Sequence, residues 1–372
     1  MRVLLSGGGT AGHINPALAI AECIKENIPD CEILFAGTPF GMEAKLIPEA
    51  GYAFTPIRVR GFQRSFAPGD IVKNIEAAGL LLSAMPRAKK IIKDFKPDLV
   101  IGTGGYVCGP ILKTAAKMGI KTAIHESNAF PGVTTKLVAR QMGVVMLATP
   151  DARRHLDADA NCVVTGNPIS SDFFGQDKEK ARRALGVEDD FCVLSFGGSL
   201  GAGKINETVC DLIEWEQKTG GIHHIHSYGR MGKTTFVKAL ESKGIYPESD
   251  PHLDIREYIN NMPVCMAAAD LVICRAGAMT LTQIQAMGLP SILIPSPVVA
   301  ENHQYHNAMV LQNNGAGIVI EQSELTSERL ISEVGAIYHD RDRLAELSAN
   351  AKKLAVTDAK EKIFAELMKL IH

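Results

Sequence analysis

Residues 3–13 read Val-Leu-Leu-Ser-Gly-Gly-Gly-Thr-Ala-Gly-His, a short apolar run that passes at once into a glycine-rich turn. A similar stretch, Cys-Val-Leu-Ser-Phe-Gly-Gly-Ser-Leu-Gly-Ala-Gly-Lys, returns at residues 192–204. Each stretch predicts a strand, a turn and a helix, and the first helix is expected to begin at about Pro16. Glycines let the backbone approach an anion, which the amides and dipole of the following helix attract. Two such units predict two similar α/β domains that face a shared cleft.

Strand-like apolar runs alternate with helical patterns along the whole chain, which is typical of parallel sheets covered by helices on both faces. The expected strands cover residues 3–6, 32–36, 99–102, 122–125, 144–148, 163–165, 192–196, 222–228, 271–274, 291–294 and 317–320. At 372 residues the chain is long enough for two cores. We expect an N-terminal domain over 1–163, a C-terminal domain over 164–342 and C-terminal helices over 343–372, the last at about 358–370.

Composition and charge argue against several classes of protein. The net charge of −2 disfavours a general nucleic-acid binder, although residues 1–163 hold 19 Lys and Arg against 14 Asp and Glu. This excess of positive charge indicates an anionic partner for the first half of the chain. A chance asymmetry of composition is the alternative explanation. No apolar run reaches the about 18 residues that span a bilayer, and Gly7 interrupts any signal-peptide pattern. The eight scattered cysteines indicate a reducing cytoplasm.

Three motif matches in the chain are weaker than they look. Residues 7–12 match the dinucleotide fingerprint, but the second strand has no acid at its end to hold a ribose. Residues 198–204 nearly match a P-loop, but Ile205 stands where a hydroxyl would bind magnesium. We interpret the Asp-x-Asp pairs at 157–159 and 340–342 as solvated loop residues. We therefore expect no required metal and no cofactor.

Seven spaced segments, taken in order, resemble one family. They are Gly-Thr-Ala-Gly-His at 9–13, Gly-Thr-Gly-Gly-Tyr-Val at 102–107, His-Glu-Ser-Asn at 125–128, Gly-Asn-Pro at 166–168, Gly-Gly-Ser-Leu-Gly-Ala at 197–202, Cys-Arg-Ala-Gly-Ala at 274–278 and Asn-His-Gln-Tyr-His-Asn-Ala at 302–308. The chain resembles the MurG-type peptidoglycan glycosyltransferases, which move N-acetylglucosamine from UDP-N-acetylglucosamine to lipid I to form lipid II. The resemblance covers nearly the whole chain. It implies a GT-B fold, two Rossmann-like domains with the last helix crossing back to the first.

The resemblance implies that the second domain binds most of the donor, UDP-N-acetylglucosamine. Ser199 would bond the diphosphate, although serine is also a common helix cap, and Ile259 would border the uracil or lie in the core. The other donor contacts that it implies there are Ala278, Met279, Thr280, Leu281, Thr282, Gln283 and Gln304. Gln283 stands where the family usually has a glutamate at the ribose, and Ser170 where some relatives carry arginine. Nucleotide affinity or selectivity is therefore expected to differ.

In the first domain, the resemblance places Thr10, Ala11, Gly12 and Asn128 at the transferred sugar and Gly104, Gly105 and Tyr106 at the lipid diphosphate. His13 is a candidate general base, because an imidazole accepts protons near neutral pH, or else a structural or sugar-binding histidine. Glu126 is the second candidate base, and His125 is expected to be structural.

Residues 66–96 combine apolar positions with a basic cluster, as peripheral membrane segments do. The apolar positions are Ile71, Ile75, Leu80, Leu81 and Leu82, and the basic ones are Arg87, Lys89, Lys90, Lys93 and Lys96. A buried helix with a solvated basic end is the commoner explanation, but a lipid-linked acceptor favours an anionic membrane surface. We expect a peripheral protein on the cytoplasmic face of the cell membrane.

The resemblance implies an inverting transfer in which the acceptor's C4 hydroxyl attacks the anomeric carbon. The alternatives are a UDP-N-acetylglucosamine 2-epimerase-like enzyme, another UDP-sugar glycosyltransferase, a nicotinamide oxidoreductase and a nucleotide-sugar sensor without activity.

Overall fold

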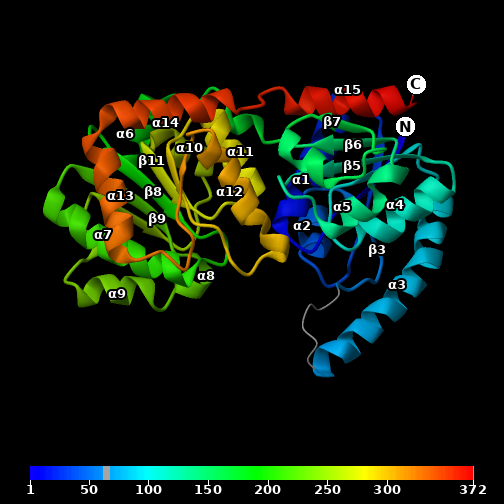
Figure 1. The fold of residues 1–372 in the computed structure, drawn as a ribbon, viewed down its shortest axis with the longest axis horizontal. Coiled ribbons are helices and arrows are strands. Elements are labelled where there is room, and N and C mark those ends of the chain that lie inside the picture. Colours follow the sequence, from blue (N-terminus) through cyan, green and yellow to red (C-terminus); the bar gives the residue numbers. More distant parts are fainter. Residues whose placement is uncertain (62–67, 372) are drawn as a thin grey trace. The chain divides into compact units, whose positions relative to one another are not determined.

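The chain forms two compact units, each built around a parallel sheet with helices packed against it (Figure 1). This computed structural model describes residues 1–61 and 68–371. The first unit comprises Met1–Ile169 with Val356–His372, and the second comprises Ser170–Ala355. The boundary expected between 163 and 164 falls inside a strand, Cys162–Val164.

Seven strands of the described residues form the sheet of the first unit, in the order β3-β2-β1-β4-β5-β6-β7. They are β1 Arg2–Ser6, β2 Glu32–Gly37, β3 Ala53–Pro56, β4 Leu99–Gly102, β5 Lys121–Glu126, β6 Val144–Leu147 and β7 Cys162–Val164. The helices are α1 Ala11–Asn27, α2 Glu43–Glu49, α3 Pro68–Phe95, α4 Cys108–Lys117, α5 Val133–Val138 and α15 Ala359–Ile371, with 3₁₀ turns η1 Ala139–Gln141 and η2 Pro150–His155.

The sheet of the second unit has the order β10-β9-β8-β11-β12-β13, and its pairs are parallel too. Its strands are β8 Phe191–Phe196, β9 Ile222–Ser227, β10 Leu253–Arg256, β11 Leu271–Cys274, β12 Ser291–Leu293 and β13 Ile318–Val319. The helices are α6 Lys178–Leu185, α7 Gly203–Thr219, α8 Gly229–Gly232, α9 Phe236–Ser242, α10 Met262–Ala268, α11 Ala278–Met287, α12 His303–Asn313, α13 Ser327–His339 and α14 Arg341–Lys353, with 3₁₀ turns η3 Ser171–Phe173, η4 Pro247–Ser249 and η5 Ala300–Asn302.

The eleven predicted strands are confirmed, whereas β3 and β10 were not predicted. Both are edge strands. No position of β3 and only Leu253 of β10 is buried, so they lack the continuous apolar run that marks a central parallel strand. The expected start of α1 at about Pro16 is wrong. The helix begins at Ala11, because the carbonyl of extended Thr10 already accepts hydrogen bonds from the amides of His13 and Ile14. Residues 11–13 are therefore the first turn of α1.

The last helix, α15, belongs to the first unit, where it packs on α1 (Figure 1, red). Ile363 and Leu367 are buried in the core that α1 and the sheet share. Lys360 adds an ion pair to Glu22 of α1, with 2.8 Å between Nζ and Oε2. The predicted helix at about 358–370 is thus confirmed.

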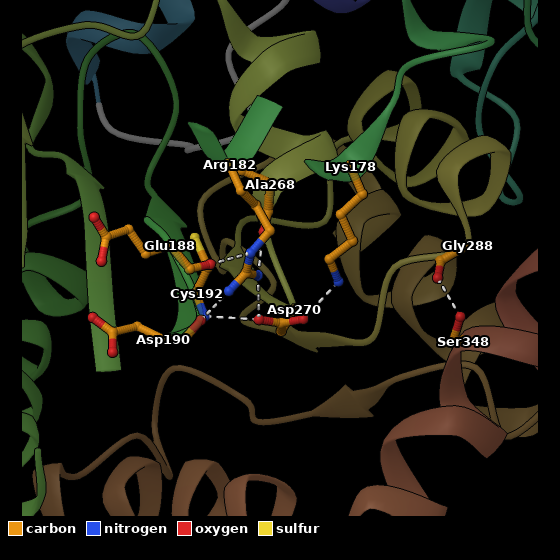
Figure 2. Close-up of polar contacts among 9 residues, drawn as sticks. All are labelled: Lys178, Arg182, Glu188, Asp190, Cys192, Ala268, Asp270, Gly288 and Ser348. Atoms are coloured by element: carbon orange, nitrogen blue, oxygen red, sulfur yellow. Dashed lines mark hydrogen bonds and ion pairs between the residues drawn. The ribbon is translucent and has the colours of Figure 1, made fainter. Parts of the chain in front are cut away.

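Asp270, just before β11, ties α6 to the start of β8 (Figure 2). Its carboxylate accepts hydrogen bonds from the Cys192 amide at 2.8 Å, from Lys178 Nζ at 2.6 Å and from Arg182 Nη1 at 3.0 Å. Burial alone would raise the pKa of Asp270, but these donors hold it below its ordinary value. Asp270 is therefore an ionised structural anchor at the amino end of the second sheet.

Candidate functional site

Each sheet has one point where its strand order reverses, between β1 and β4 in the first unit and between β8 and β11 in the second. In open parallel sheets ligands bind at such a point, outside the carboxyl ends of the strands. The loops that leave these four strands are residues 7–10, 103–107, 197–202 and 275–277. They carry four of the seven segments on which the family resemblance rests.

The two loops of the first unit touch each other through glycines. A side chain at Gly105, whose φ is +84°, would place its Cβ 2.3 Å from the Gly8 carbonyl oxygen. A side chain at Gly104, with φ of +105°, would collide with the ring of His13. Since both positions also need left-handed backbone, these glycines are what lets the two loops and the imidazole come together.

His13 lies in the first turn of α1 and is held by the loop after β4. Its Nδ1 is 3.0 Å from the Thr103 carbonyl oxygen, and Thr103 Oγ1 donates to the His13 carbonyl at 2.7 Å. A carbonyl only accepts, so Nδ1 carries the proton and Nε2 carries the lone pair of the neutral ring. The half-buried neutral ring in this tautomer can accept a proton at Nε2, as a general base must.

Sequence reasoning missed Glu43, which lies fully buried beneath the first glycine loop. Its carboxylate accepts hydrogen bonds from the Gly9 amide and the Thr38 amide, both at 3.0 Å, and from Thr38 Oγ1 at 2.6 Å. Burial alone would raise the pKa of Glu43, but the bonds from Thr38 and Gly9 outweigh it and lower the pKa. The Gly9 amide, which the glycine pattern offered to a ligand anion, thus binds the chain's own carboxylate.

Glu126, the second candidate base, is committed to holding a loop. Its Oε1 accepts from the backbone and side-chain nitrogens of Asn128, both at 3.0 Å. Its Oε2 accepts from the Gly132 amide at 3.0 Å and from Thr135 Oγ1 at 2.6 Å. Four donors around a buried carboxylate favour a positioning role for Glu126. The neighbouring His125 is fully buried and donates from Nε2 to the Gly166 carbonyl at 2.9 Å, which agrees with a structural role.

A cavity of about 640 Å³ opens beside the first glycine loop, and sequence reasoning missed most of its lining. Tyr106, half-exposed, stands with Gly8 and Gly9 on one side of it. Arg58 and Arg60 add two cationic side chains from the segment after β3. In the sequence these two arginines appear only as Arg-Val-Arg at 58–60, and nothing in that pattern indicates that they lie near the glycine loop.

In the second unit, Ser199 lies exposed in the loop between β8 and α7. The alternative reading of Ser199 as a helix cap is wrong, because α7 begins at Gly203 with Ala202 before it. Gly201, with φ of +83°, packs so closely on the Tyr228 carbonyl that a Cβ would lie 2.2 Å from that oxygen. The loop thus packs closely against the end of β9, with Ser199 among its exposed residues.

Helix α11 starts directly after the β11 loop, with extended Gly277 before its first residue. The amides of Ala278, Met279 and Thr280 have no acceptor within the helix, so they can point at an anion. Leu281 and Thr282 differ, because both side chains are buried in the fold. Their expected donor contact stays a prediction.

The remaining candidate donor residues are spread over the same sheet edge. Gln283 is half-buried in α11, whereas Ile259 is almost fully buried, which favours the core interpretation. Gln304 Oε1 accepts from the Ser296 amide at 2.9 Å and so ties α12 to the loop after β12. Just before α12, Glu301 and Asn302 both have left-handed backbone, which costs about 1–3 kcal/mol each and is concentrated at functional sites.

The membrane prediction falls partly outside the described residues, since Ile71, Ile75, Leu81 and Leu82 belong to the part of α3 whose side chains are not described. Leu80 lines the 640 Å³ cavity. The basic residues of this segment, Arg87, Lys89, Lys90, Lys93 and Lys96, are exposed. Among the described residues, no helix combines the length and the apolar character needed to cross a bilayer.

Known protein families match both units of this chain, including the loops described above. Residues 3–146 match the glycosyltransferase family 28 N-terminal domain, and residues 192–363 match the family's C-terminal domain. A UDP-N-acetylglucosamine–N-acetylmuramyl-(pentapeptide) pyrophosphoryl-undecaprenol N-acetylglucosamine transferase from Acetivibrio thermocellus is 44% identical over 98% of this chain and 96% of the relative. The enzyme of the same name from Ruminiclostridium cellulolyticum is 41% identical over the full length of both.

Solved structures agree with the fold. MurG from Acinetobacter baumannii superposes with a TM-score of 0.79 and 29% identity over 99% of both chains. A protein described as a UDP-N-acetylglucosamine 2-epimerase from Listeria monocytogenes reaches 0.71 over 99% of this chain and 96% of the other, but at 12% identity it shares the fold alone. The chain therefore belongs to glycosyltransferase family 28 and, within it, to the MurG-type N-acetylglucosamine transferases of GT-B fold.

Proposed function

We propose that this chain transfers N-acetylglucosamine from UDP-N-acetylglucosamine to the C4 hydroxyl of the muramoyl sugar of lipid I, releasing UDP and forming lipid II. The observation that carries the proposal is the 44% identity, over 98% of the chain, to a transferase named for these substrates. The epimerase neighbour has 12% identity, so the comparison favours transfer over epimerisation.

Inversion follows if the acceptor hydroxyl attacks the anomeric carbon from the side opposite to UDP. His13 takes the hydroxyl proton on Nε2, while the bond from Nδ1 to the Thr103 carbonyl fixes the ring and its tautomer. Glu126 acts differently. Its four hydrogen bonds hold the loop that carries Asn128, which then contacts the sugar.

The charge that develops on the leaving UDP meets fixed donors in the second unit. The free amides at the start of α11 and the Ser199 hydroxyl supply hydrogen bonds, and the helix dipole adds positive potential. Since such donors are already in place, transfer needs no metal ion.

The lipid acceptor binds in the first unit. Arg58 and Arg60, in the cavity beside Gly8 and Tyr106, match the charge of a diphosphate. The exposed basic residues of α3 attract the anionic lipid of the cytoplasmic leaflet, and this makes the protein peripheral.

The test is UDP release from UDP-N-acetylglucosamine with and without a soluble lipid I analogue, in excess EDTA. Acceptor-dependent release is expected to persist. Release that is restored only by Mg²⁺ or Mn²⁺ would refute the metal-free step. Three other outcomes would support a rival function instead. Epimerised sugar formed without acceptor would indicate an epimerase, an absorbance change with NAD would indicate an oxidoreductase, and binding without UDP release would indicate a sensor.

His13→Ala separates catalysis from binding. Loss of a general base is expected to lower kcat about 10²–10⁴-fold and to abolish the acidic limb of the pH profile. Glu126→Gln serves as the comparison, because a positioning residue changes the rate but leaves that limb in place. A rise in acceptor KM alone for His13→Ala would make His13 a binding residue.

A further inference from the structure

Three potential metal ligands meet at the amino end of the second sheet, the edge opposite to the glycine loops. Asp190 immediately precedes β8, His223 is the second residue of β9, and His252 immediately precedes β10. One ligand atom from each lies within 4.8 Å of the other two. The parallel register, with Cys192 opposite His223 and Leu253 opposite His224, is what brings them to one edge.

His223 is the unusual member of this cluster. It is 2% exposed, and neither ring nitrogen has a hydrogen-bond partner among the described residues. Buried polar groups in folded proteins are nearly always paired, so an imidazole with two unpaired nitrogens indicates a missing partner. Burial lowers the pKa of His223, although Asp254 and Asp190 oppose this, and the neutral ring is the form that binds metals.

The other two side chains are placed to complete the cluster. Asp190 Oδ2 lies 2.7 Å from His252 Nδ1, and the His252 side chain is 51% exposed, so an ion can enter from solvent. The backbone around Asp190 is held by Arg182, which donates from Nε to the Glu188 carbonyl at 2.9 Å and from Nη2 to the Asp190 carbonyl. Figure 2 shows the Asp190 carboxylate directed away from Arg182 and Asp270.

We propose that Asp190, His223 and His252 bind a zinc ion through one carboxylate oxygen and two imidazole nitrogens, with water as the fourth ligand. Zinc favours this ligand set, with bonds of about 2.0–2.2 Å in tetrahedral geometry. Ligand atoms around such an ion lie about 3.3 Å apart. Asp190 Oδ2 and His252 Nδ1, now hydrogen-bonded at 2.7 Å, must therefore give up that bond and separate to admit zinc, which the exposed His252 side chain permits. A second carboxylate, that of Asp254, also raises the pKa of His223. Asp254 already forms an ion pair with Arg256, so it is not among the proposed ligands.

The site is structural, not catalytic. Asp190 precedes β8 at one end, whereas Ser199 follows its other end, and six strand residues rise about 20 Å. Zinc there joins β8, β9 and the edge strand β10 without reaching the reacting groups. This inference is independent of the proposed transfer and does not alter its metal-free chemistry.

The test uses the full-length chain, stripped with EDTA and exchanged into chelator-free buffer. Zinc is titrated in competition with a chromogenic chelator, and thermal unfolding is followed with and without zinc. We expect one equivalent to bind and the unfolding midpoint to rise. His252→Ala and Asp190→Asn should each raise the zinc Kd by at least about tenfold and remove the rise in midpoint.

His339→Ala is the matched control, an exposed histidine of the same unit, and should keep both effects. Co²⁺ in place of zinc should give the visible absorption of a tetrahedral complex, lost in the same two variants. UDP affinity should be equal in all variants, which also shows that they fold. The proposal is overturned if the wild type does not bind one equivalent of zinc. It is also overturned if both ligand variants still bind zinc, as they would if cysteines held the ion.

Discussion

Glu43→Gln tests whether the buried carboxylate organises the first glycine loop. The glutamine oxygen can keep the two bonds from Thr38, but its amide nitrogen then faces the Gly9 N–H, donor against donor. Leaving buried donors unpaired costs about 1–3 kcal/mol. Because Glu43 is fully buried, solvent offers little compensation.

The sign of the effect follows from the pKa. Hydrogen bonds lower the pKa of Glu43 in the folded protein despite its burial, so the ionised form stabilises the fold. That stabilisation is present above the unfolded pKa of about 4.3 and is lost as the pH falls through the folded value. The difference between wild type and Glu43→Gln should therefore be full at neutral pH and shrink in acid.

Native-state hydrogen exchange of peptides covering residues 3–13 is the suitable assay, because the two units need not unfold together. A loss of about 1–3 kcal/mol should speed exchange there about 5- to 150-fold. Glu49→Gln is the control. Glu49 is an exposed residue of α2 whose ion pair with Lys45 is 3.7 Å long, and its loss should change stability by about 0.5 kcal/mol or less. Equal exchange in the two variants would refute the organising role of Glu43.

Three further predictions follow from the loops and buried groups. Gly105→Ala should disrupt the loop and lower turnover, because its Cβ would lie 2.3 Å from the Gly8 carbonyl oxygen. Gly119→Ala is the control, since Gly119 also has left-handed backbone but has no atom near the added Cβ, and it should leave turnover unchanged. Equal turnover in the two variants would show that the contact is not needed. Ser199→Ala should weaken UDP binding by about 1–3 kcal/mol in calorimetry, and an unchanged Kd would remove Ser199 from the site. Burial lowers the pKa of His125, so unfolding takes up a proton below about pH 6.5. Stability therefore decreases as the pH is lowered below that value. His125→Gln should reduce that slope by up to about 1.4 kcal/mol per pH unit in denaturant unfolding, and an identical slope would contradict a neutral buried imidazole.

Much of the fold was predictable because its signals are local. The central strands β1, β4, β8 and β11 are continuous apolar runs, and glycine turns follow β1 and β8 directly in the sequence. The edge strands β3 and β10 escaped prediction, since a half-exposed strand loses the apolar run that identifies it. The start of α1 was misplaced because a proline favours the first helical turn, yet Pro16 lies inside this helix.

The sequence by itself determined that two glycine-loop units exist, and the ordered segments pointed to the family and to His13 as a candidate base. Only the tertiary structure decided what those residues face. Glu43 binds Gly9 from 34 positions away, His13 meets Thr103 across 90 positions, and Asp190 reaches His252 across 62. The physical reason is that local patterns specify strands, turns and helices. Partners so distant along the chain meet only once strand order and register bring the ends of separate strands to one edge of a sheet.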